Sequence, residues 1–327
     1  FMLRILLLLV IASMGLFELA RLAGALAYYP YPWSGSASLS HIVGAFLFGI
    51  GMVLAGGCVV GTLYKMGSGS LLSLLAFFGL LTGSVVYAEF HPFWKALFKD
   101  TLVFSGRETL PQLLNISPTI PVLIIIVLVI ALYVGPFHKL PWERESVVEG
   151  YVQPWKAALF LALIGLLSYI FVGMPLGITT AYTKMGALIE QLFFSEHVSN
   201  LSYLQTQSLD YIPPFSEVSI KGGAGPQFDA VAVIQYPIIG GIVLGAALSA
   251  VLLGEFKLRL NAPRRQVVSV AAGGIVMGLA CRMTPGCNVW HLMGGLPIFS
   301  LQAIFYLIGL VPGAWAGSWI LKRFVVR

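Results

Sequence analysis

The chain has 327 residues, of which 58% are hydrophobic and only 10% are charged, and its formal net charge is +6. A soluble globular domain carries about 25% charged residues, so this composition excludes a soluble enzyme, a disordered chain and a nucleic-acid-binding protein as first interpretations. The mean hydropathy of +0.90 indicates a protein whose solvent is the lipid bilayer. The three cysteines are an odd number and do not indicate a disulfide framework.

Long apolar stretches follow one another along the chain, and a membrane-spanning helix needs about 20 such residues. The stretches are continuous and rich in Leu, Ile and Ala, a pattern that favours helices over alternating strands. We therefore predict an all-α integral membrane protein, a polytopic inverted-repeat bundle of about 8–9 transmembrane helices with short re-entrant half-helices. The apolar stretches cover residues 3–24, 42–55, 70–88, 119–135, 155–172, 231–254, 267–280 and 297–321.

The chain contains an internal repeat with an offset of 229 residues. The repeat superposes a Gly-Cys turn of each copy and, after one inserted residue, two glycines of the span that follows: Cys58 on Cys287, Gly79 on Gly309, and Gly83 on Gly313. Broken helices at matching positions of an internal repeat are typical of transporters and channels. The repeat therefore predicts a transport function more directly than the composition does.

We predict a single transmembrane domain over residues 1–327, with repeat halves over about 1–135 and about 150–321. The second half begins with a span and a short amphiphilic element that have no counterpart before residue 3. We therefore expect the N-terminal part of the first half to be missing from this sequence.

The loops give a hint of inverted topology. Residues 25–41 have no Lys or Arg, whereas their counterpart, residues 255–266, has four. By the positive-inside rule, the loop 255–266 is the best cytoplasmic candidate.

Each Gly-Cys turn is expected to be followed by a short helix, over about 58–66 and about 287–295. Irregular backbone at membrane depth is tolerated only inside protein or beside a polar cavity. The first N–H groups of each short helix would then form an anion site without a buried basic side chain. A third such helix is predicted over 176–190, with Pro175 at its first turn.

The cysteines at the turns suit a sulfur-containing anion, because a neutral thiol is a weak S–H donor with a polarizable surface. A thiolate would repel an anion, so the thiols are expected to stay neutral. We predict a substrate path formed by residues at or next to the two turns: Cys58, Cys287, Gly57, Gly286, Asn288, His291 and Cys281. Binding of a soft metal such as Cu(I) by the cysteines and Met283 is an alternative, and packing as small hydrophobic residues is another.

Several of these residues also have a structural explanation. Asn288 could donate its amide to the ion or cap the short helix, and His291 could line the path or bond to a carbonyl. Cys281 matches Met52 in the repeat, which favours a packing role. Arg282 is a charge near membrane depth, and such a charge is either functional or reaches the interface.

The motif segments at residues 56–67 (Gly-Gly-Cys-Val-Val-Gly-Thr-Leu-Tyr-Lys-Met-Gly) and 286–289 (Gly-Cys-Asn-Val) resemble the repeated motifs of YeeE/YedE-family membrane proteins. The segment 173–187 is similar to that family's other repeated element. The resemblance covers about residues 1–321, and the Gly-Cys motifs rather than the Leu-rich spans carry it.

The resemblance implies uptake of thiosulfate across the bacterial inner membrane, through an hourglass of helices in which cysteines pass the ion on by S–H···S contacts. It identifies Cys58 and Cys287 as the path cysteines, and implies a further cysteine in an N-terminal element that this sequence lacks. It also implies a small cytosolic TusA-like sulfur carrier as a partner, beside thiosulfate and membrane lipid. Some relatives are linked to selenium or to other sulfur compounds, so a permease for these is the alternative.

The sequence thus favours a transporter with no cofactor, no nucleic-acid partner and no enzymatic activity. A membrane enzyme that transfers sulfur on a persulfidated cysteine is the competing class. No Ser/His/Asp arrangement, paired carboxylates or phosphate-binding loop in the sequence supports any other chemistry.

Overall fold

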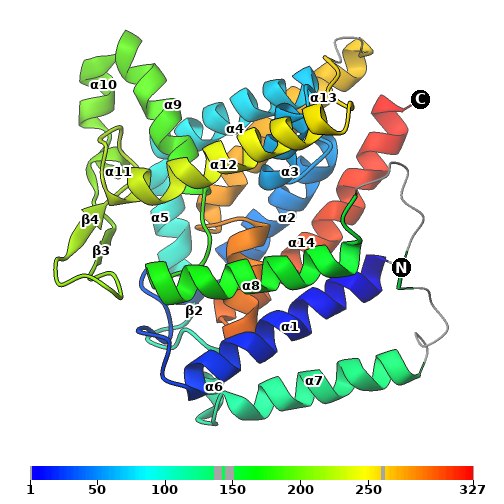
Figure 1. Ribbon diagram of the computed structural model, residues 1–327. Helices are drawn as coiled ribbons and strands as arrows, with labels where there is room; N and C mark the ends of the chain where they lie inside the picture. Colours follow the sequence, from blue (N-terminus) through cyan, green and yellow to red (C-terminus); the bar gives the residue numbers. More distant parts are fainter. Residues whose placement is uncertain (1, 136–141, 144–150, 259–261, 327) are drawn as a thin grey trace.

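The computed structural model describes residues 2–135, 142–143, 151–258 and 262–326, which form a bundle of helices (Figure 1). The predicted all-α polytopic class is confirmed, since the only strands in the described residues form two short antiparallel pairs, β1 (Ala37–Ser38) with β2 (Leu102–Phe104) and β3 (Leu209–Tyr211) with β4 (Ile220–Gly222). The helices are α1 (Met2–Leu22), α2 (Ser40–Leu54), α3 (Val59–Gly67), α4 (Leu71–Glu89), α5 (His91–Asp100), α6 (Leu110–Leu114), α7 (Thr119–Val134), α8 (Pro154–Val172), α9 (Thr179–Phe193), α10 (Ser195–Asn200), α11 (Ser202–Gln205), α12 (Ala230–Leu252), α13 (Arg264–Met283), η1 (Val289–Gly295), η2 (Leu296–Ile298), α14 (Leu301–Ile320) and η3 (Leu321–Val325).

Most of the predicted apolar stretches are helices long enough to cross a bilayer. Within the described residues, seven segments meet that length and composition, and α2 and α3 together count as one of them: Leu3–Leu22, Ser40–Gly67, Leu71–Glu89, Pro154–Val172, Ala230–Leu252, Arg264–Met283 and Leu301–Val325. The one predicted stretch that is not among these seven segments is 119–135. It forms α7, which is apolar but has only 16 residues. The molecule is therefore a multi-pass membrane protein.

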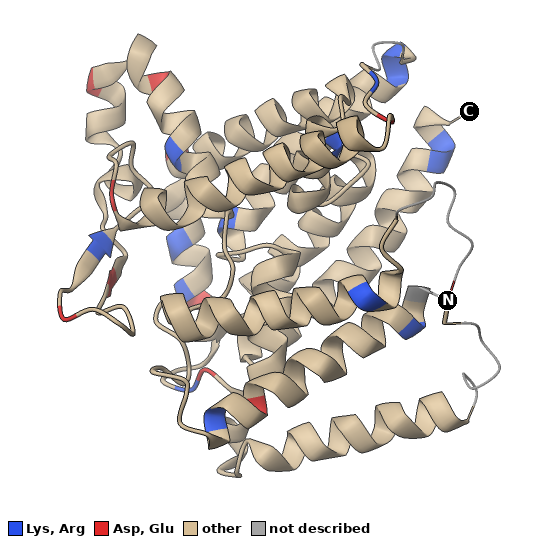
Figure 2. Cartoon of the chain, in the orientation of Figure 1, with Lys and Arg blue, Asp and Glu red and all other residues tan. Residues whose placement is uncertain are grey.

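Charge and apolar surface are separated as a membrane requires. The outer face of α7 exposes more than half of the surface of Ile124, Val127 and Leu128, which suits contact with lipid. Charged residues lie mainly at helix ends and in loops (Figure 2). One such group, the basic end, is formed where η3 packs beside the start of α13, and it consists of Arg264, Arg265, Lys322 and Arg323. Arg259 of the predicted basic loop lies outside the described residues.

Helices α2 and α13 are repeat counterparts, and they pack against each other in an antiparallel arrangement. Gly44, near the start of α2, lies against the end of α13, and Gly273 of α13 lies against the end of α2. A Cβ atom at either glycine would come within 3.5 Å of three residues of the opposite helix: Ala280, Met283 and Thr284 for Gly44, and Gly51, Leu54 and Ala55 for Gly273. The repeat offset converts the first set of contacts into the second, as expected when a two-fold axis relates inverted elements.

The other two main helix pairs repeat this relation. In each pair, glycines of one helix lie against backbone of the other, so a Cβ atom there would come within 3.1 Å of it. The contacts are Gly79 with Ala271 and Gly274 and Gly83 with Ile275 for α4 on α13, and Gly309 with Ile42 and Ala45 and Gly313 with Phe46 for α14 on α2. Small residues allow such close approach where helices associate without water.

Two short elements differ from the sequence prediction. The helix expected over about 287–295 is a seven-residue π-helix, η1. Within it, His291 Nε2 lies 2.6 Å from the carbonyl oxygen of Thr284. Helix α9 begins at Thr179 and not beside Pro175. Pro175 instead packs on η1, because a Cβ atom on Gly294 would lie only 2.3 Å from the Cβ atom of Pro175.

Candidate functional site

The first Gly-Cys turn joins α2 to α3. Gly56 has a φ of +75°, a left-handed conformation that favours glycine, and Gly57 follows it partly exposed. Cys58 is the N-cap of α3, and its sulfur accepts a hydrogen bond from the backbone N–H of Gly61 at 3.4 Å. From the other end of α3, Lys65 Nζ donates to the carbonyl of Gly56. Cys58 is half-buried, so its thiol is the most accessible of the three cysteines.

The second turn joins α13 to η1 and presents its cysteine in the same way. Cys287 is 2% exposed, and its sulfur interacts with the backbone N–H of Trp290. Trp290 is the repeat counterpart of Gly61, so each cysteine meets the amide of the third residue after it. Gly286 has no room for a side chain, because a Cβ atom there would lie 2.7 Å from the Trp290 ring.

The three cysteines interact electrostatically with the same two tyrosines. Cys281 and Cys287 belong to one buried hydrophobic cluster shared by α3, α4, α9 and α13. The hydroxyls of Tyr182 in α9 and Tyr306 in α14 each lie within electrostatic range of all three cysteine side chains. The thiol of Cys281 donates to the carbonyl of Gly278 in the same helix at 3.1 Å, so its proton is already used in a hydrogen bond.

Asn288 and His291 both contact Tyr306. The Tyr306 hydroxyl donates to Asn288 Oδ1 at 2.6 Å, and Asn288 Nδ2 lies 3.3 Å from the sulfur of Met52. The His291 ring stacks on Tyr306 with centroids 4.3 Å apart, while its Nε2 bonds to the carbonyl of Thr284. His291 therefore has the carbonyl bond that the structural explanation requires, and Asn288 makes no side-chain cap on η1.

Sequence reasoning missed Tyr182. Its hydroxyl is buried and has no hydrogen-bond partner among the described residues. Such an orphaned polar group in a core requires an explanation, and its place among the cysteines provides one. The available signal was the position of Tyr182 within the element 173–187 that resembles the family's other repeated motif.

Arg282, at the end of α13, is a buried basic side chain close in sequence to the second Gly-Cys turn. Its surface is only 6% exposed, so the side chain does not reach the interface. Its guanidinium donates to the hydroxyl of Thr180 at 3.0 Å and to that of Thr179, both in the first turn of α9. Beside it lies a cavity of about 330 Å³ whose walls include Gln235 and Trp290.

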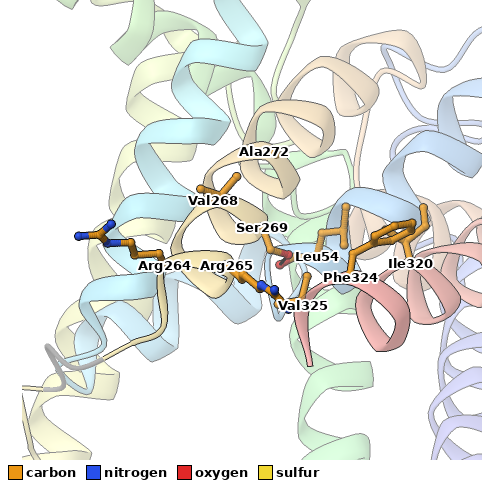
Figure 3. A pocket seen from close by; sticks show the side chains of 9 residues that line it. All are labelled: Leu54, Arg264, Arg265, Val268, Ser269, Ala272, Ile320, Phe324 and Val325. Carbon is orange, nitrogen blue, oxygen red and sulfur yellow. Dashed lines mark hydrogen bonds between the residues drawn. The ribbon is translucent and has the colours of Figure 1, made fainter. Parts of the chain in front are cut away.

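A second cavity, of about 400 Å³, lies at the opposite end of α13 (Figure 3). Arg264 and Arg265 of the basic end flank it, and its walls are mostly apolar side chains such as Leu54 and Phe324. Neither Gly-Cys turn lines this cavity, so it is separate from the cysteine site.

The three cysteines do not form a metal centre in this geometry. Within the described residues, the one group of three potential ligands whose atoms lie within 4.8 Å of one another is Glu89, Glu190 and His197. Its contacts are explained without an ion, since His197 Nε2 lies 2.6 Å from Glu89 and 3.6 Å from Glu190. The soft-metal interpretation of the cysteines gains no support from this arrangement.

The Glu89 carboxylate, which accepts a hydrogen bond from His197, raises the pKa of His197 above its ordinary value of 6.5. A raised pKa in the folded state means that this pair stabilises the fold below pH 6.5 and that the contribution is lost as the pH rises through the raised pKa. We expect NMR titration of His197 to give a midpoint above 6.5, and E89Q to return it toward 6.5. Identical midpoints in the two proteins would contradict the pairing.

The fold and the paired re-entrant turns define a multi-pass helical membrane protein of the transporter class. The chain belongs to the sulphur transport family, whose pattern matches residues 1–316. The resemblance to YeeE/YedE proteins is thereby confirmed, and so is a transport function at the level of the family.

Two relatives named as thiosulfate transporters match nearly the whole chain, and a third relative matches half of it. The chain is 29% identical to the thiosulfate transporter TsuA of Spirochaeta thermophila, over 95% of this chain and 85% of the relative. It is 26% identical to the thiosulfate transporter TsuA of Escherichia coli, over 95% of this chain and 81% of the relative. A probable transporter YedE of Salmonella typhimurium is 26% identical over 50% of this chain and 37% of its own length.

Proposed function

We propose that this protein takes up thiosulfate, or a closely related sulfur oxyanion, across the bacterial inner membrane. The observation that carries the proposal is that the two repeat-matched cysteines lie within electrostatic range of each other and of the buried tyrosines Tyr182 and Tyr306. The relatives named thiosulfate transporters match 95% of the chain and support the same substrate class.

The chemistry of the site suits an anion that has lost its water. Inside a protein a dehydrated anion needs hydrogen-bond donors in place of solvent. Cys58 and Cys287 supply S–H groups and Tyr182 supplies an unpartnered O–H group. The soft terminal sulfur of thiosulfate matches the polarizable thiols. Gly57 and Gly286 keep side chains away from the turns, and no covalent bond to the ion is formed in this proposal.

We further propose that the domain consists of two inverted halves, over about residues 1–135 and 150–321. The antiparallel packing of α2 on α13 and the matched glycine contacts support this division. The positive-inside rule assigns the basic end to the cytoplasmic side. The ion would then enter from the Arg282 cavity, pass the cysteines and leave toward the basic end.

A small cytosolic TusA-like sulfur carrier is the proposed acceptor of the ion at the basic end, following the family resemblance. If so, a tagged carrier is expected to copurify with the protein, and charge reversal at Lys322 and Arg323 is expected to weaken the association.

The proposed function is tested by uptake into liposomes that contain the purified protein. We expect vesicles to accumulate ³⁵S-thiosulfate faster than protein-free vesicles, and unlabelled thiosulfate to compete. Copper uptake in the same vesicles is expected to equal that of the protein-free control. Accumulation of copper without thiosulfate would refute the proposal.

A further inference from the structure

The geometry points to a separate recognition site for the oxygen end of the substrate, built by Arg282, Thr179 and Thr180 at the wall of the 330 Å³ cavity. In its assignment of thiosulfate the inference rests on the proposed function. It adds a division of labour, in which the guanidinium and hydroxyls bind oxyanion oxygens before the thiols meet the terminal sulfur. A consequence is that sulfate, which has the oxygens but no terminal sulfur, binds here and blocks entry without being transported.

The charge of Arg282 is buried and lacks an anionic partner. The residue is 6% exposed, and its Nε has no hydrogen-bond partner. The salt bridges of the described residues involve Arg21, Lys184, His197 and Lys221 but not Arg282. A buried cation without a counter-ion is strongly unfavourable, and intramembrane cations of this kind mark ion paths. The missing charge is that of an anion in the adjacent cavity.

The hydroxyls beside Arg282 are prepared to donate. Thr179 and Thr180 accept hydrogen bonds from the guanidinium through Oγ1, and no hydrogen bond donated by either hydroxyl is found in the described part of the chain. Both O–H groups are therefore available to an acceptor. The guanidinium also interacts with the neutral side chains of Tyr203 and Cys281, and its Nε–H makes no hydrogen bond. Guanidinium donors match the spaced oxygens of an oxyanion, and bonds to a charged acceptor are the strong ones.

The cavity next to the guanidinium has the size and polarity for such a ligand. Its volume is about 330 Å³, whereas one water takes about 30 Å³. The cavity is therefore large enough for a tetrahedral anion. No acidic side chain lines it, and its other walls are polar or aromatic, among them Gln235, Tyr203 and Trp33. An anion there would meet no repulsive charge, and the aromatic walls would lower the local dielectric constant.

The cavity ends at the second Gly-Cys turn. Trp290 lines the cavity with its side chain, while its backbone N–H faces the sulfur of Cys287. Arg282 follows Cys281 directly in α13. Arg282 lies 18 residues after Arg264 in α13, so about 27 Å separates it from the basic end. The recognition site is therefore on the entry side of the proposed direction.

The test measures the KM of ³⁵S-thiosulfate uptake into liposomes, together with inhibition by sulfate. For R282Q we expect KM to rise by roughly 10- to 150-fold, because hydrogen bonds to a charged group are lost. We also expect inhibition by sulfate to disappear. R282K keeps the charge without the planar fork and is expected to lie between R282Q and the parent protein. The matched control is K156Q, which removes an exposed cation in the first turn of α8 that lines neither cavity, and it is expected to leave both values unchanged.

Direct binding separates this site from the proposed function. In calorimetry with sodium sulfate on the purified protein, the parent and C287A are expected to bind, and R282Q is expected not to bind. This outcome supports the site even if thiosulfate is not the transported ion. Unchanged KM and unchanged sulfate binding in R282Q overturn it. T180V keeps the arginine, so it tests the same site if R282Q does not fold, and a KM equal to that of the parent would count against the site.

Discussion

Replacing Cys287 by alanine is expected to reduce thiosulfate uptake by roughly 10- to 150-fold, which corresponds to one lost hydrogen bond to a charged group of about 1.5–3 kcal/mol. Cys58→Ala is expected to act to the same degree, because each sulfur meets the amide of the third residue after it. The fold should survive both changes, since alanine is smaller and brings no unpaired polar atom. Uptake of ³⁵S-thiosulfate into liposomes measures the effect.

Cys281→Ala is the matched control for these variants. Its thiol proton is already used by the carbonyl of Gly278, so we expect uptake to fall by much less than in C58A or C287A. Wild-type uptake in both C58A and C287A would remove the thiols from the mechanism. Intact-mass measurement during uptake tests the competing enzyme, because a persulfide on a cysteine would add the mass of one sulfur atom, and we expect no such gain.

Gly83→Ala is expected to destabilise the protein by about 1–3 kcal/mol or more, because added volume in a tight contact forces backbone apart. A Cβ atom on Gly83 would lie 2.0 Å from the carbonyl oxygen of Ile275, where α4 meets α13. Gly313→Ala is expected to have a similar effect, since its Cβ atom would lie 2.2 Å from the carbonyl oxygen of Phe46. Thermal unfolding of the detergent-solubilised protein measures both.

Gly241→Ala in α12 provides the control, because nothing lies within 4 Å of a Cβ atom at this position. Alanine favours a helix over glycine by about 1 kcal/mol, so we expect this variant to melt at or above the temperature of the parent. If G83A and G313A were as stable as G241A, the close packing of the two helix pairs would be contradicted.

The sequence predicted the framework well for physical reasons. Membrane spans can be predicted because lipid requires long apolar helices. The Gly-Cys turns could be predicted because the repeat places Cys58 on Cys287. The same offset predicted which glycines correspond, such as Gly79 and Gly309, but only the structure showed that these glycines form the helix contacts. Contacts between helices depend on three-dimensional packing, which spacing along the chain does not contain.

The site was predicted less completely. Arg282 was visible as an unusual charge, but its burial depends on the first turn of α9 docking against it from 102 residues away. The start of α9 was misplaced because Pro175 fits a helix N-terminus locally, whereas here it packs on η1. Tyr182 was overlooked because an aromatic residue in an apolar helix carries no signal of an unpaired hydroxyl until its neighbours are known.

The backbone contacts along α2, α4, α13 and α14 have a mechanical consequence. Where the Cα atoms of glycines lie directly against backbone carbonyls of the neighbouring helix, no compressible side-chain layer remains to let one helix slide or tilt on the next. Alternating access by rigid-body rocking of two halves would have to break these interfaces in every cycle. Motion during turnover is therefore expected to be confined to the two Gly-Cys turns. The four helices α2, α4, α13 and α14 are expected to stay in place while an ion passes.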